Sequence, residues 1–425
     1  MKILYYNWVQ FDNKDRHGGG VNVYQHNLID ELKNNPNYDL YFLSSGFKYN
    51  PFLSSPYVEE TKNIFGGKCK TFEIINSPII APAIVIYMNP RKFIEDEESY
   101  KIFKEFIQKY GPFDVIHFNN IEGISVNVLR VKKDFPKTKI IFSIHNYQII
   151  CPLVFYFQDN KYICKDFKDG KKCLNCAPFK PPKRYYTDRC NYYFFDKISV
   201  SLLPFFKLLI KSFFKLFTFK AKNYMGSRET MVASDYARYR QHNIEQLNKY
   251  VDVILAVSDR TRQIMIEHGV NPEIIKTSYI GTKFSETELG YSVAPKSDKL
   301  TIAYLGYQDT QKGYYFLINA LSKLDNCLKQ NVNIVLAVCD IHKRKALKRL
   351  KGFNNITIYN GYKHEKLKEI LSGVNLGIIP VLWEDNLPQI AIEMVAHGVP
   401  ILCSSFGGAS ELCASDLFKF KGGNE

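Results

Sequence analysis

Short apolar runs alternate with amphipathic segments along most of this chain. A short apolar run is typical of a parallel strand buried on both faces, whereas apolar positions repeating at three and four residues favour a helix. On this basis we expect strands at 2–8, 39–44, 115–118, 139–144, 253–258, 300–305, 333–338, 355–359, 376–380 and 399–403. Helices are expected at 21–33, 100–109, 259–268, 314–324, 341–351, 364–372 and 389–397. The alternation occurs twice and predicts an α/β fold of two doubly wound, Rossmann-like domains that face a cleft.

A polar segment separates the two series of strands and helices. Residues 283–299 contain Pro295 and several Ser, Glu and Lys residues, a composition typical of an interdomain linker. We therefore predict a first domain at 1–285 and a second at 300–425. The first domain carries a Cys-rich and amphipathic insertion at about 151–245, and residues 50–95 follow no regular pattern.

The composition agrees with two globular domains. The 425 residues are 46% hydrophobic and 23% charged, which excludes a disordered chain and suffices for two full cores. The start, MKILYYNW, has one lysine and no apolar signal core, so we expect no secretion signal and a cytoplasmic protein. The net charge of +15 indicates an anionic partner, such as nucleic acid, sugar phosphates or an acidic membrane surface.

One stretch near the C-terminus, NLGIIPVLWEDNLPQIAIEMVAHGVPILCSSFGGASE, organises the second half. It predicts strand, loop, helix, strand and Gly-rich loop, and both loops follow carboxyl ends of parallel strands, where open α/β sheets bind ligands. Asn386 is the expected N-cap of the helix, Pro388 lies in its first turn, and Gly398 suits its C′ position. A phosphate can bind at this helix N-terminus. The carboxylates of Asp385 and Glu393 flank it and can accept hydrogen bonds from the hydroxyls of a sugar nucleotide.

These residues carry a family resemblance. D-N-x-P-x-x-x-x-E, followed by G-x-P-I-L-x-S and GG-x-x-E, resembles the donor-site motif of retaining glycosyltransferases of family 4, which have the GT-B fold. That motif has two glutamates with seven residues between them, and here Asp385 stands in the first position and Glu393 in the second. The resemblance implies that Glu393 holds the ribose and Asp385 the donor sugar, and that catalysis requires no metal or other cofactor.

The resemblance also implies which residues bind the donor, a UDP- or GDP-sugar. Lys312 would clamp the diphosphate, while Tyr307 stands where the family usually has a second cation, an arginine. The residues after the strand 355–359 would hold the base, largely by backbone. The implied donor-binding set is Gly19, Gly20, Lys312, Gly361, Tyr362, Asn386, Leu387, Pro388, Gly407 and Gly408. Family members normally continue past the position of Glu425 with a helix, so the resemblance implies a second domain truncated at its end.

Two features of the first domain are also candidates for ligand binding. The strand, Gly-Gly-Gly loop and helix around Gly19 and Gly20 differ from a dinucleotide-binding motif, which needs glycine at Val23. The loop is either a plain tight turn or, as the resemblance implies, faces the donor diphosphate.

His117 and His145 each end a predicted strand. A lone histidine is more often structural, but IIFSIHN resembles the family strand whose terminal histidine contacts the transferred sugar, which singles out His145.

Four cysteines form a cluster in the insertion. Without a secretion signal, cysteines are more often thiols or metal ligands than disulfides. The C-L-N-C pair together with two upstream cysteines predicts a tetrahedral structural zinc site, with reduced, partly buried thiols as the alternative. The proposed ligands are Cys151, Cys164, Cys173 and Cys176.

The segment 197–222 is apolar, aromatic and cationic. Lys207, Lys211 and Lys215 recur at four-residue steps, and together with Pro204 they argue against a membrane-spanning helix. A lysine face opposite a Phe/Leu face is typical of a helix lying in an anionic membrane interface, and the alternative is a helix packed on its own domain.

Together with the family resemblance, which implies a retaining glycosyltransferase, these patterns predict an enzyme peripheral to the cytoplasmic membrane face. It would move a sugar from a nucleoside-diphosphate sugar to a glycan or lipid-linked acceptor, as in bacterial surface polysaccharide synthesis. Two alternatives stay open. One is a catalytically weak sugar-nucleotide or glycan-binding relative. The other is a zinc-containing nucleic-acid binder, for which the sequence has no motif, so we expect no nucleic-acid partner.

Overall fold

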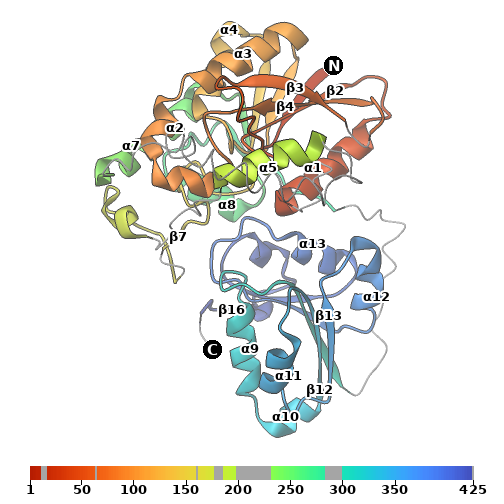
Figure 1. Cartoon of the computed structure of the whole chain (residues 1–425). Helices are drawn as coiled ribbons and strands as arrows, with labels where there is room; N and C mark the ends of the chain where they lie inside the picture. The colour runs from red at the N-terminus through yellow and green to blue at the C-terminus, as the bar shows by residue number, and fades with distance from the viewer. Residues whose placement is uncertain are drawn as a thin grey trace. The chain divides into compact units, whose positions relative to one another are not determined.

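The computed structural model describes residues 1–10, 17–62, 65–158, 161–176, 185–197, 231–282 and 299–423 (Figure 1). The chain divides into two compact units. The first unit is Met1–Tyr156, Lys165–Ala256 and Ile264–Lys276, and the second is Phe157–Cys164, Val257–Gln263 and Thr277–Glu425. Two short segments expected in the first domain, 157–164 and 257–263, therefore group with the second unit. Each unit contains its own largely parallel sheet, which confirms the predicted fold class of two Rossmann-like α/β units.

The sheet of the first unit follows the predicted strands and extends them at both edges, with β10 at one edge and β4 and β3 at the other. Its order is β10-β9-β6-β5-β1-β2-β4-β3, and the pairing is parallel from β9 to β4, with β3 antiparallel to β4. The bounds are β1 (Lys2–Tyr6), β2 (Asp39–Ser45), β3 (Tyr57–Thr61), β4 (Cys69–Ile75), β5 (Val115–Phe118), β6 (Lys139–Ile144), β9 (Val253–Ala256) and β10 (Ile275–Thr277). Leu4, Phe42 and Ile116 are buried along the central strands. The short antiparallel hairpin β7 (Phe157–Gln158) and β8 (Tyr162–Ile163) is separate.

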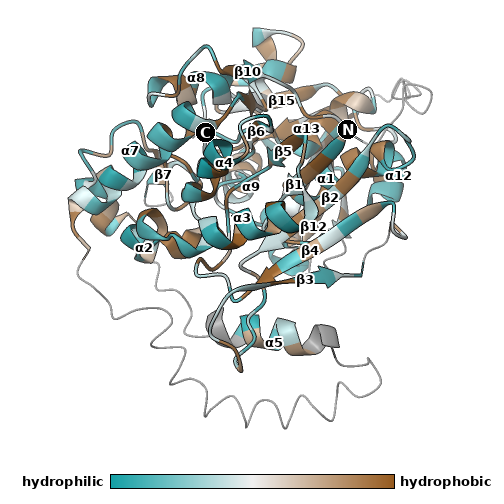
Figure 2. Ribbon diagram, turned by 90° about the horizontal axis from the view of Figure 1, so that it is seen from above, coloured by the Kyte–Doolittle hydropathy of each residue, from teal (hydrophilic) through white to brown (hydrophobic). Residues whose placement is uncertain are grey.

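Helices surround this sheet with polar outer faces. Figure 2 shows the hydrophilic colouring of α3 and α7. The bounds are α1 (Gly19–Leu32), α2 (Pro90–Glu95), α3 (Glu98–Tyr110), α4 (Val131–Asp134), α5 (Tyr185–Lys197), α7 (Ala233–Tyr250) and α8 (Asp259–Glu267), with 3₁₀ turns η1 (Ala83–Met88), η2 (Val126–Arg130) and η3 (Lys171–Asn175). Residues 50–95, which follow no regular pattern in sequence, contain β3, β4, η1 and α2. The strand β3 is a short edge strand, none of whose residues is fully buried, which is why periodicity does not find it.

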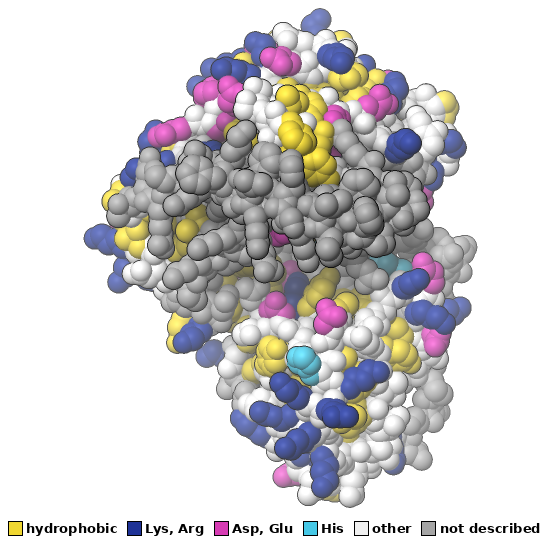
Figure 3. Space-filling view, in the orientation of Figure 1, with side chains coloured by type: hydrophobic (Ala, Val, Ile, Leu, Met, Phe, Trp, Pro, Cys, Tyr) yellow, Lys and Arg dark blue, Asp and Glu magenta, His cyan; other side chains and the backbone are white. Residues whose placement is uncertain are grey.

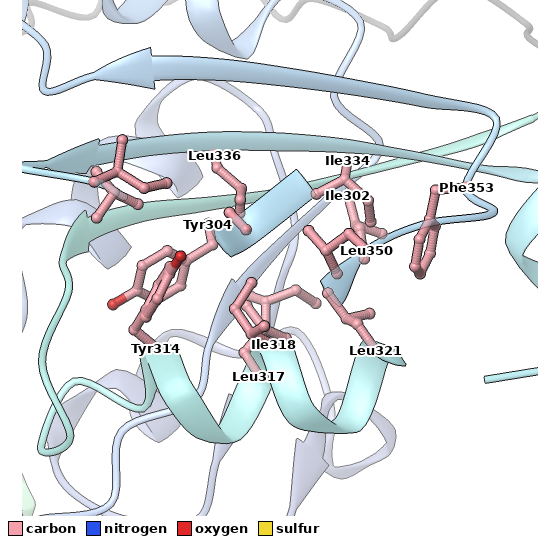
Figure 4. Packing of buried hydrophobic residues seen from close by; sticks show 14 residues of the cluster. Ile302, Tyr304, Tyr314, Leu317, Ile318, Leu321, Ile334, Leu336, Leu350 and Phe353 are labelled. Carbon is pink, nitrogen blue, oxygen red and sulfur yellow. The ribbon is translucent and has the colours of Figure 1, made fainter. Parts of the chain in front are cut away.

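The second unit is built on a parallel sheet of order β13-β12-β11-β14-β15-β16. The bounds are β11 (Leu300–Tyr307), β12 (Val332–Cys339), β13 (Asn355–Asn360), β14 (Leu376–Ile379), β15 (Ile401–Ser404) and β16 (Lys419–Phe420). Figure 4 shows how Ile302 and Leu336 of the strands face Ile318 of α9 (Tyr314–Ser322) in a closely packed core. This core fixes the strand ends, and therefore the loops that follow them.

The other helices of the second unit are short. They are α10 (Asn326–Gln330), α11 (Lys343–Arg349), α12 (Leu367–Leu371) and α13 (Gln389–Ala396), with 3₁₀ turns η5 (His364–Lys366), η6 (Gly408–Leu412) and η7 (Asp416–Phe418). Gly398 has the predicted C′ role, because its φ is +73° and its N–H bonds the carbonyl of Val395 at 2.9 Å. The N–H of Val399 bonds the carbonyl of Met394 at 2.9 Å, which completes a Schellman cap for α13.

Two predicted segments lie outside the described residues. These are nearly all of the amphipathic segment 197–222 and residues 283–298 of the expected linker. Among the helices that the structure describes, none combines the length and the apolar character that crossing a membrane would require.

Candidate functional site

Most of the loop between β14 and α13 is buried. Trp383, Glu384, Asp385, Asn386 and Leu387 are each at most 6% exposed. A loop of polar residues at the carboxyl end of a central parallel strand is unusual in being buried, because its polar groups then need partners. The partners come from the loops that follow β11 and β15 and from the start of α8.

Asp385 pairs with Lys312. The Lys312 ammonium donates to Oδ2 of Asp385 at 2.5 Å and lies 5.3 Å from the centre of the Trp383 ring. The β11–α9 loop that carries Lys312 is held against the β14 loop by the N–H of Leu382, which donates to the carbonyl of Gln311 at 2.9 Å. Gly313 makes this approach possible, since a Cβ there would lie 1.7 Å from the carbonyl oxygen of Pro380. Two predicted site residues, 73 positions apart, therefore meet.

The Gly-Gly pair after β15 packs on the other side of the same loop. The N–H of Gly408 donates to the carbonyl of Asp385 at 2.8 Å. A Cβ on Gly407 would lie 2.2 Å from that carbonyl oxygen, and one on Gly408 would lie 2.2 Å from the carbonyl oxygen of Asn386. Only glycine fits at either position. The two glycines therefore pack directly against the β14–α13 loop and also form the turn that follows β15.

Glu384, next to Asp385, has a different set of partners. Its carboxylate accepts the N–H of Gly407 at 2.8 Å and a forked pair of bonds from Arg260, at 2.5 Å from Nη2 and 3.1 Å from Nε. Glu411 accepts the backbone N–H groups of Asp259 and Arg260 at 2.9 and 2.7 Å, at the start of α8. Glu384 is therefore fully engaged by protein groups, and Asp385 is the acid beside the lysine. The sequence pattern did not indicate Arg260.

Glu393 lies one turn inside α13 and is 1% exposed. Within the described residues neither of its carboxylate oxygens has a hydrogen-bond partner, although Nδ1 of His364 lies 3.0 Å from Oε1. Burial raises the pKa of Tyr362, and the charge of Glu393 raises it further, which places this ring near the carboxylate. Gly361, with φ +73°, turns the chain after β13 and donates its N–H to the carbonyl of Val338 at 2.9 Å. A buried carboxylate without hydrogen bonds is costly, so this acid is suited to hydroxyl donors from a ligand.

The N-terminus of α13 differs from the prediction. Asn386 is not the N-cap. The helix begins at Gln389, Pro388 occupies the cap position in an extended conformation with φ −62° and ψ 124°, and no side chain caps the helix. The Asn386 amide instead donates to Oγ1 of Thr261 at 3.3 Å. The reason is local, because the residue before a proline is biased away from the helical conformation. The first N–H groups of α13 thus have no side-chain cap, a typical setting for an anion.

In the first unit, His145 and His117 lie at neighbouring strand ends. Nε2 of His145 is 3.2 Å from Oδ1 of Asn119, and its ring centre is 5.1 Å from that of Tyr24 on α1. Burial and the charge of His117 lower the pKa of His145 to about 3. His117 is 2.7 Å from Oγ of Ser143, and burial lowers its pKa to about 4. Both rings are therefore neutral at physiological pH and act as hydrogen-bonding groups.

A buried acid that the sequence analysis missed bonds Asn146, the residue that follows His145. Glu122 accepts the side-chain amide of Asn146 on Oε1 at 3.0 Å and the N–H of Ala83 on Oε2 at 2.6 Å. Burial raises its pKa to about 7. Its position in the loop after β5 was the available signal, because acids in loops at the carboxyl ends of parallel strands are site candidates.

The Gly-Gly-Gly loop begins α1. Gly18 is the N-cap with φ +87°, and its Cβ would lie 2.6 Å from Cγ1 of Val9. Gly19 has φ +52°, and a Cβ there would meet no atom within 4 Å. Gly19 and Gly20 are exposed at the helix N-terminus. Glycine at 18 is thus required by packing, whereas glycine at 19 suits a left-handed conformation at an open surface.

The four cysteines are buried, but a cation lies against one of them. Nη2 of Arg240 is 3.0 Å from Sγ of Cys173, and the guanidinium stacks on the Phe167 ring at 3.8 Å. No group of three or more His, Cys, Asp or Glu side chains within the described ranges is placed to hold a metal ion. Of the predicted zinc ligands, Cys151, Cys173 and Cys176 belong to the first unit and Cys164 to the second. A guanidinium repels a metal ion electrostatically, and the structural zinc stays a prediction.

Comparison with known proteins gives a family match for one segment of the chain and a fold for nearly all of it. Residues 299–420 match the family model described as glycosyl transferases group 1. The chain is 22% identical over 178 residues to an uncharacterized 41.2 kDa protein in the cps region of Klebsiella pneumoniae, and 24% identical over 192 residues to an uncharacterized glycosyltransferase of Methanocaldococcus jannaschii. These matches cover 40% and 41% of this chain, and 48% of each relative, so the chain spans about half the length of the curated relatives it matches.

Solved structures resemble nearly the whole chain. HepE from Anabaena in complex with UDP has a TM-score of 0.54 at 13% identity, covering 100% of this chain and 86% of that one. The lipopolysaccharide outer core galactosyltransferase WaaB has a TM-score of 0.54 at 12% identity, covering 100% and 87%. Sucrose-phosphate synthase from Thermosynechococcus elongatus has a TM-score of 0.53 at 14% identity, covering 96% and 82%. At these identities the likeness shows the fold, and it confirms the predicted GT-B class.

Proposed function

We propose that this protein is a glycosyltransferase that moves a sugar from a nucleoside-diphosphate sugar to a glycan or lipid-linked acceptor. The observation that carries the proposal is the arrangement at the N-terminus of α13. The Lys312–Asp385 pair lies at the start of the helix, and the buried carboxylate of Glu393, which has no hydrogen-bond partner among the described residues, lies one turn inside it. All three residues fall within the segment that matches glycosyl transferases group 1.

The donor would use each of these groups differently. Its diphosphate would bind the uncapped N–H groups of α13 and the ammonium of Lys312. Negative charge grows on the diphosphate as the sugar leaves, so a fixed cation and helix N–H groups lower the barrier electrostatically. Asp385, released from Lys312 by the diphosphate, would accept a hydroxyl of the sugar. Glu393 would accept the ribose hydroxyls, which satisfies its otherwise unpaired oxygens.

A UDP-sugar is the first donor to test, with a GDP-sugar next. HepE, which shares the fold, has been solved with UDP and with UDP-glucose, and WaaB is named a galactosyltransferase. Tyr307 stands in place of the second phosphate-binding cation that the family resemblance implies, so we expect Lys312 to supply most of the phosphate affinity from side chains.

The chemistry of the histidines supports a retaining, front-face reaction. With a pKa near 3, His145 is a weak base and cannot take the acceptor proton efficiently at neutral pH. The proton would go instead to the leaving diphosphate. His145 would then serve as a neutral hydrogen-bonding group toward a sugar hydroxyl, and Gly19 and Gly20 would present an open backbone to the donor.

Positive charge supports an acceptor held at an anionic membrane surface on the cytoplasmic side. Figure 3 shows Lys and Arg side chains gathered on the face of the second unit, where the exposed cations of α11 and its flank include Lys343, Arg344, Lys348 and Arg349. The segment 197–222 would add an amphipathic, lysine-rich contact. The relative in the cps region of Klebsiella pneumoniae favours a glycan acceptor.

A thermal-shift screen with UDP-, GDP-, ADP- and CMP-sugars tests the donor site, and release of sugar from a labelled donor tests catalysis. A ligand that binds only the folded protein raises its apparent stability. We expect one nucleotide class to raise the melting temperature of the wild type and not of Glu393→Gln. Stabilisation without turnover would instead indicate a non-catalytic sugar-nucleotide binder. Salt-dependent binding of nucleic acid with no response to nucleotide sugars would contradict the proposal. Elemental analysis of the same sample tests the predicted structural zinc.

A further inference from the structure

His364 lies against the carboxylate of Glu393. Nδ1 of His364 is 3.0 Å from Oε1, while the histidine side chain is 44% exposed and the glutamate 1% exposed. His364 opens the turn η5, two residues after Tyr362, and Glu393 is on α13. The histidine therefore reaches from the surface to an acid that is buried, and its Nδ1 lies against Oε1 of that acid.

The contact with His364 is important because the Glu393 carboxylate lacks hydrogen bonds. Neither oxygen has a hydrogen bond of good geometry from any described residue, and the His364 nitrogen, 3.0 Å from Oε1, is a potential donor placed against this carboxylate. A carboxylate without partners rotates freely about its terminal torsion, which is broad and two-fold. A donor on Oε1 removes that freedom and leaves Oε2 for a ligand.

We propose that His364 is a positioning residue for the donor nucleotide, holding Oε1 of Glu393 so that Oε2 accepts the ribose hydroxyls. This inference rests on the proposed function. It assigns His364 no contact with the reacting atoms. Its effect on affinity is transmitted through Glu393 and should appear only with nucleotides whose ribose carries hydroxyls.

The chain contains a matched control for the substitution. Nδ1 of His397 lies 2.7 Å from the backbone carbonyl oxygen of Glu393, so it touches the same residue without touching its carboxylate. His397→Leu removes a histidine next to Glu393 but leaves the carboxylate as it was. His364→Leu removes the carboxylate contact. His364→Asn keeps a donor N–H on a short side chain and tests for rescue.

The experiment is a binding cycle measured by isothermal titration calorimetry on the full chain. UDP and its 2′,3′-dideoxy counterpart are titrated into the wild type and the three variants. We expect His364→Leu to weaken UDP binding about tenfold, a change of about 1.4 kcal/mol, and to leave dideoxy-UDP binding unchanged. His364→Asn should recover most of the UDP affinity. His397→Leu should change neither ligand.

The contrary results are distinct. If His364→Leu weakens both ligands equally, or neither, its role is structural or absent and the inference is overturned while the donor site stands. If the wild type binds UDP but does not prefer it to dideoxy-UDP, the ribose does not depend on Glu393 and the inference is again overturned. If no ribonucleoside diphosphate, whether UDP, GDP or ADP, binds the wild type, the proposed function itself fails, and the inference with it.

Discussion

Lys312 and Asp385, 73 positions apart in sequence, form an ion pair in which Nζ lies 2.5 Å from Oδ2. The carboxylate is 9% exposed and the lysine side chain 34%. One partner is thus buried and the other reaches solvent, where it is accessible to a diphosphate. The pair holds both side chains at the N-terminus of α13 in advance of any ligand, which reduces the entropy lost when a donor binds.

The first prediction concerns Lys312. Lys312→Met should lower donor affinity by about ten- to a hundredfold, since it removes a charge-assisted phosphate contact and leaves Asp385 buried without its cation. Calorimetric titration with UDP measures the effect. Lys345→Met on the exposed face of α11 is the control and should bind UDP as the wild type does. Equal affinities for the Lys312 variant and the wild type would show that the diphosphate binds elsewhere.

The second prediction separates packing from backbone strain at a glycine. Gly313 and Gly373 both have φ of +76°, but a Cβ on Gly313 would lie 1.7 Å from the carbonyl oxygen of Pro380, whereas one on Gly373 would meet nothing within 4 Å. Gly373→Ala should lower the free energy of unfolding by about 1 kcal/mol, the usual cost of this conformation in a non-glycine residue. Gly313→Ala should cost clearly more and should also weaken UDP binding, because it separates the Lys312 loop from the β14 loop.

The free energies of unfolding of the two alanine variants are compared by urea unfolding, monitored by a spectroscopic signal from the second unit. A similar loss of stability in both would mean that the two loops adjust around the added methyl group. The predicted close packing of Gly313 would then be wrong.

The third prediction is a dependence of stability on pH through Glu122. Its pKa is raised from 4.5 to about 7, so the folded state binds a proton more tightly than the unfolded state does. Stability from this group is therefore fully present below pH 4.5 and is lost as pH rises to about 7, at up to about 1.4 kcal/mol per pH unit. His117 and His145 act in the opposite direction. Their folded pKa values lie below 6.5, so their contribution is lost as pH falls below 6.5.

Comparison of Glu122→Gln with the wild type isolates the acid. The histidine contribution is common to both proteins, so the difference between their unfolding free energies should change between pH 4.5 and 7 in favour of the variant. The stability of Glu122→Gln at any single pH is a poor measure of this effect. A glutamine side chain cannot accept hydrogen bonds from both the Asn146 amide and the Ala83 N–H as the carboxylate does. A constant difference across this range would show that Glu122 titrates normally.

Most strands could be predicted from the sequence because parallel strands buried on both faces consist of continuous apolar runs, as in β11 and β14. It failed at β3, an edge strand, and at the start of α13, where Pro388 shifts the cap. For the site, Asp385, Lys312 and the Gly407–Gly408 pair were found from motif spacing, and the structure brings them together.

Other partners could not be read from spacing. The Arg260–Glu384 pair spans 124 positions, and His364 and Glu393 lie on different elements. Such pairs depend on side-chain directions at the ends of distant elements, which a single sequence does not encode in any local pattern. Glu122 was missed because its position in the loop after β5 was the one local signal, and its burial becomes evident only in the structure.

The last prediction concerns two thiols at the base of the Gly407–Gly408 loop. Sγ of Cys403, at the buried end of β15, lies 3.0 Å from Sγ of the partly exposed Cys413. Hydrogen peroxide should oxidise Cys413 to a sulfenic acid with release of water, and the Cys403 thiol should then displace a second water to form a disulfide. Forming this bond at about 2.0 Å requires Cys413 to move, and the loop between the two cysteines carries both glycines that pack on Asp385 and Asn386.

Oxidation should therefore weaken UDP binding, and dithiothreitol should restore it. Cleavage after Glu393 and Glu411 places Cys403 in peptide 394–411 and Cys413 in peptide 412–425. The two peptides should stay joined after peroxide treatment until they are reduced. Cys413→Ser should give neither the linked peptides nor the loss of binding, whereas Cys327→Ser, which removes an exposed thiol on α10, should behave as the wild type. Separate peptides with both thiols alkylated after peroxide treatment would show that the 3.0 Å contact is only packing. Linked peptides with unchanged UDP affinity would show that the Gly407–Gly408 loop tolerates the bond, so that its fit to Asp385 does not determine donor binding.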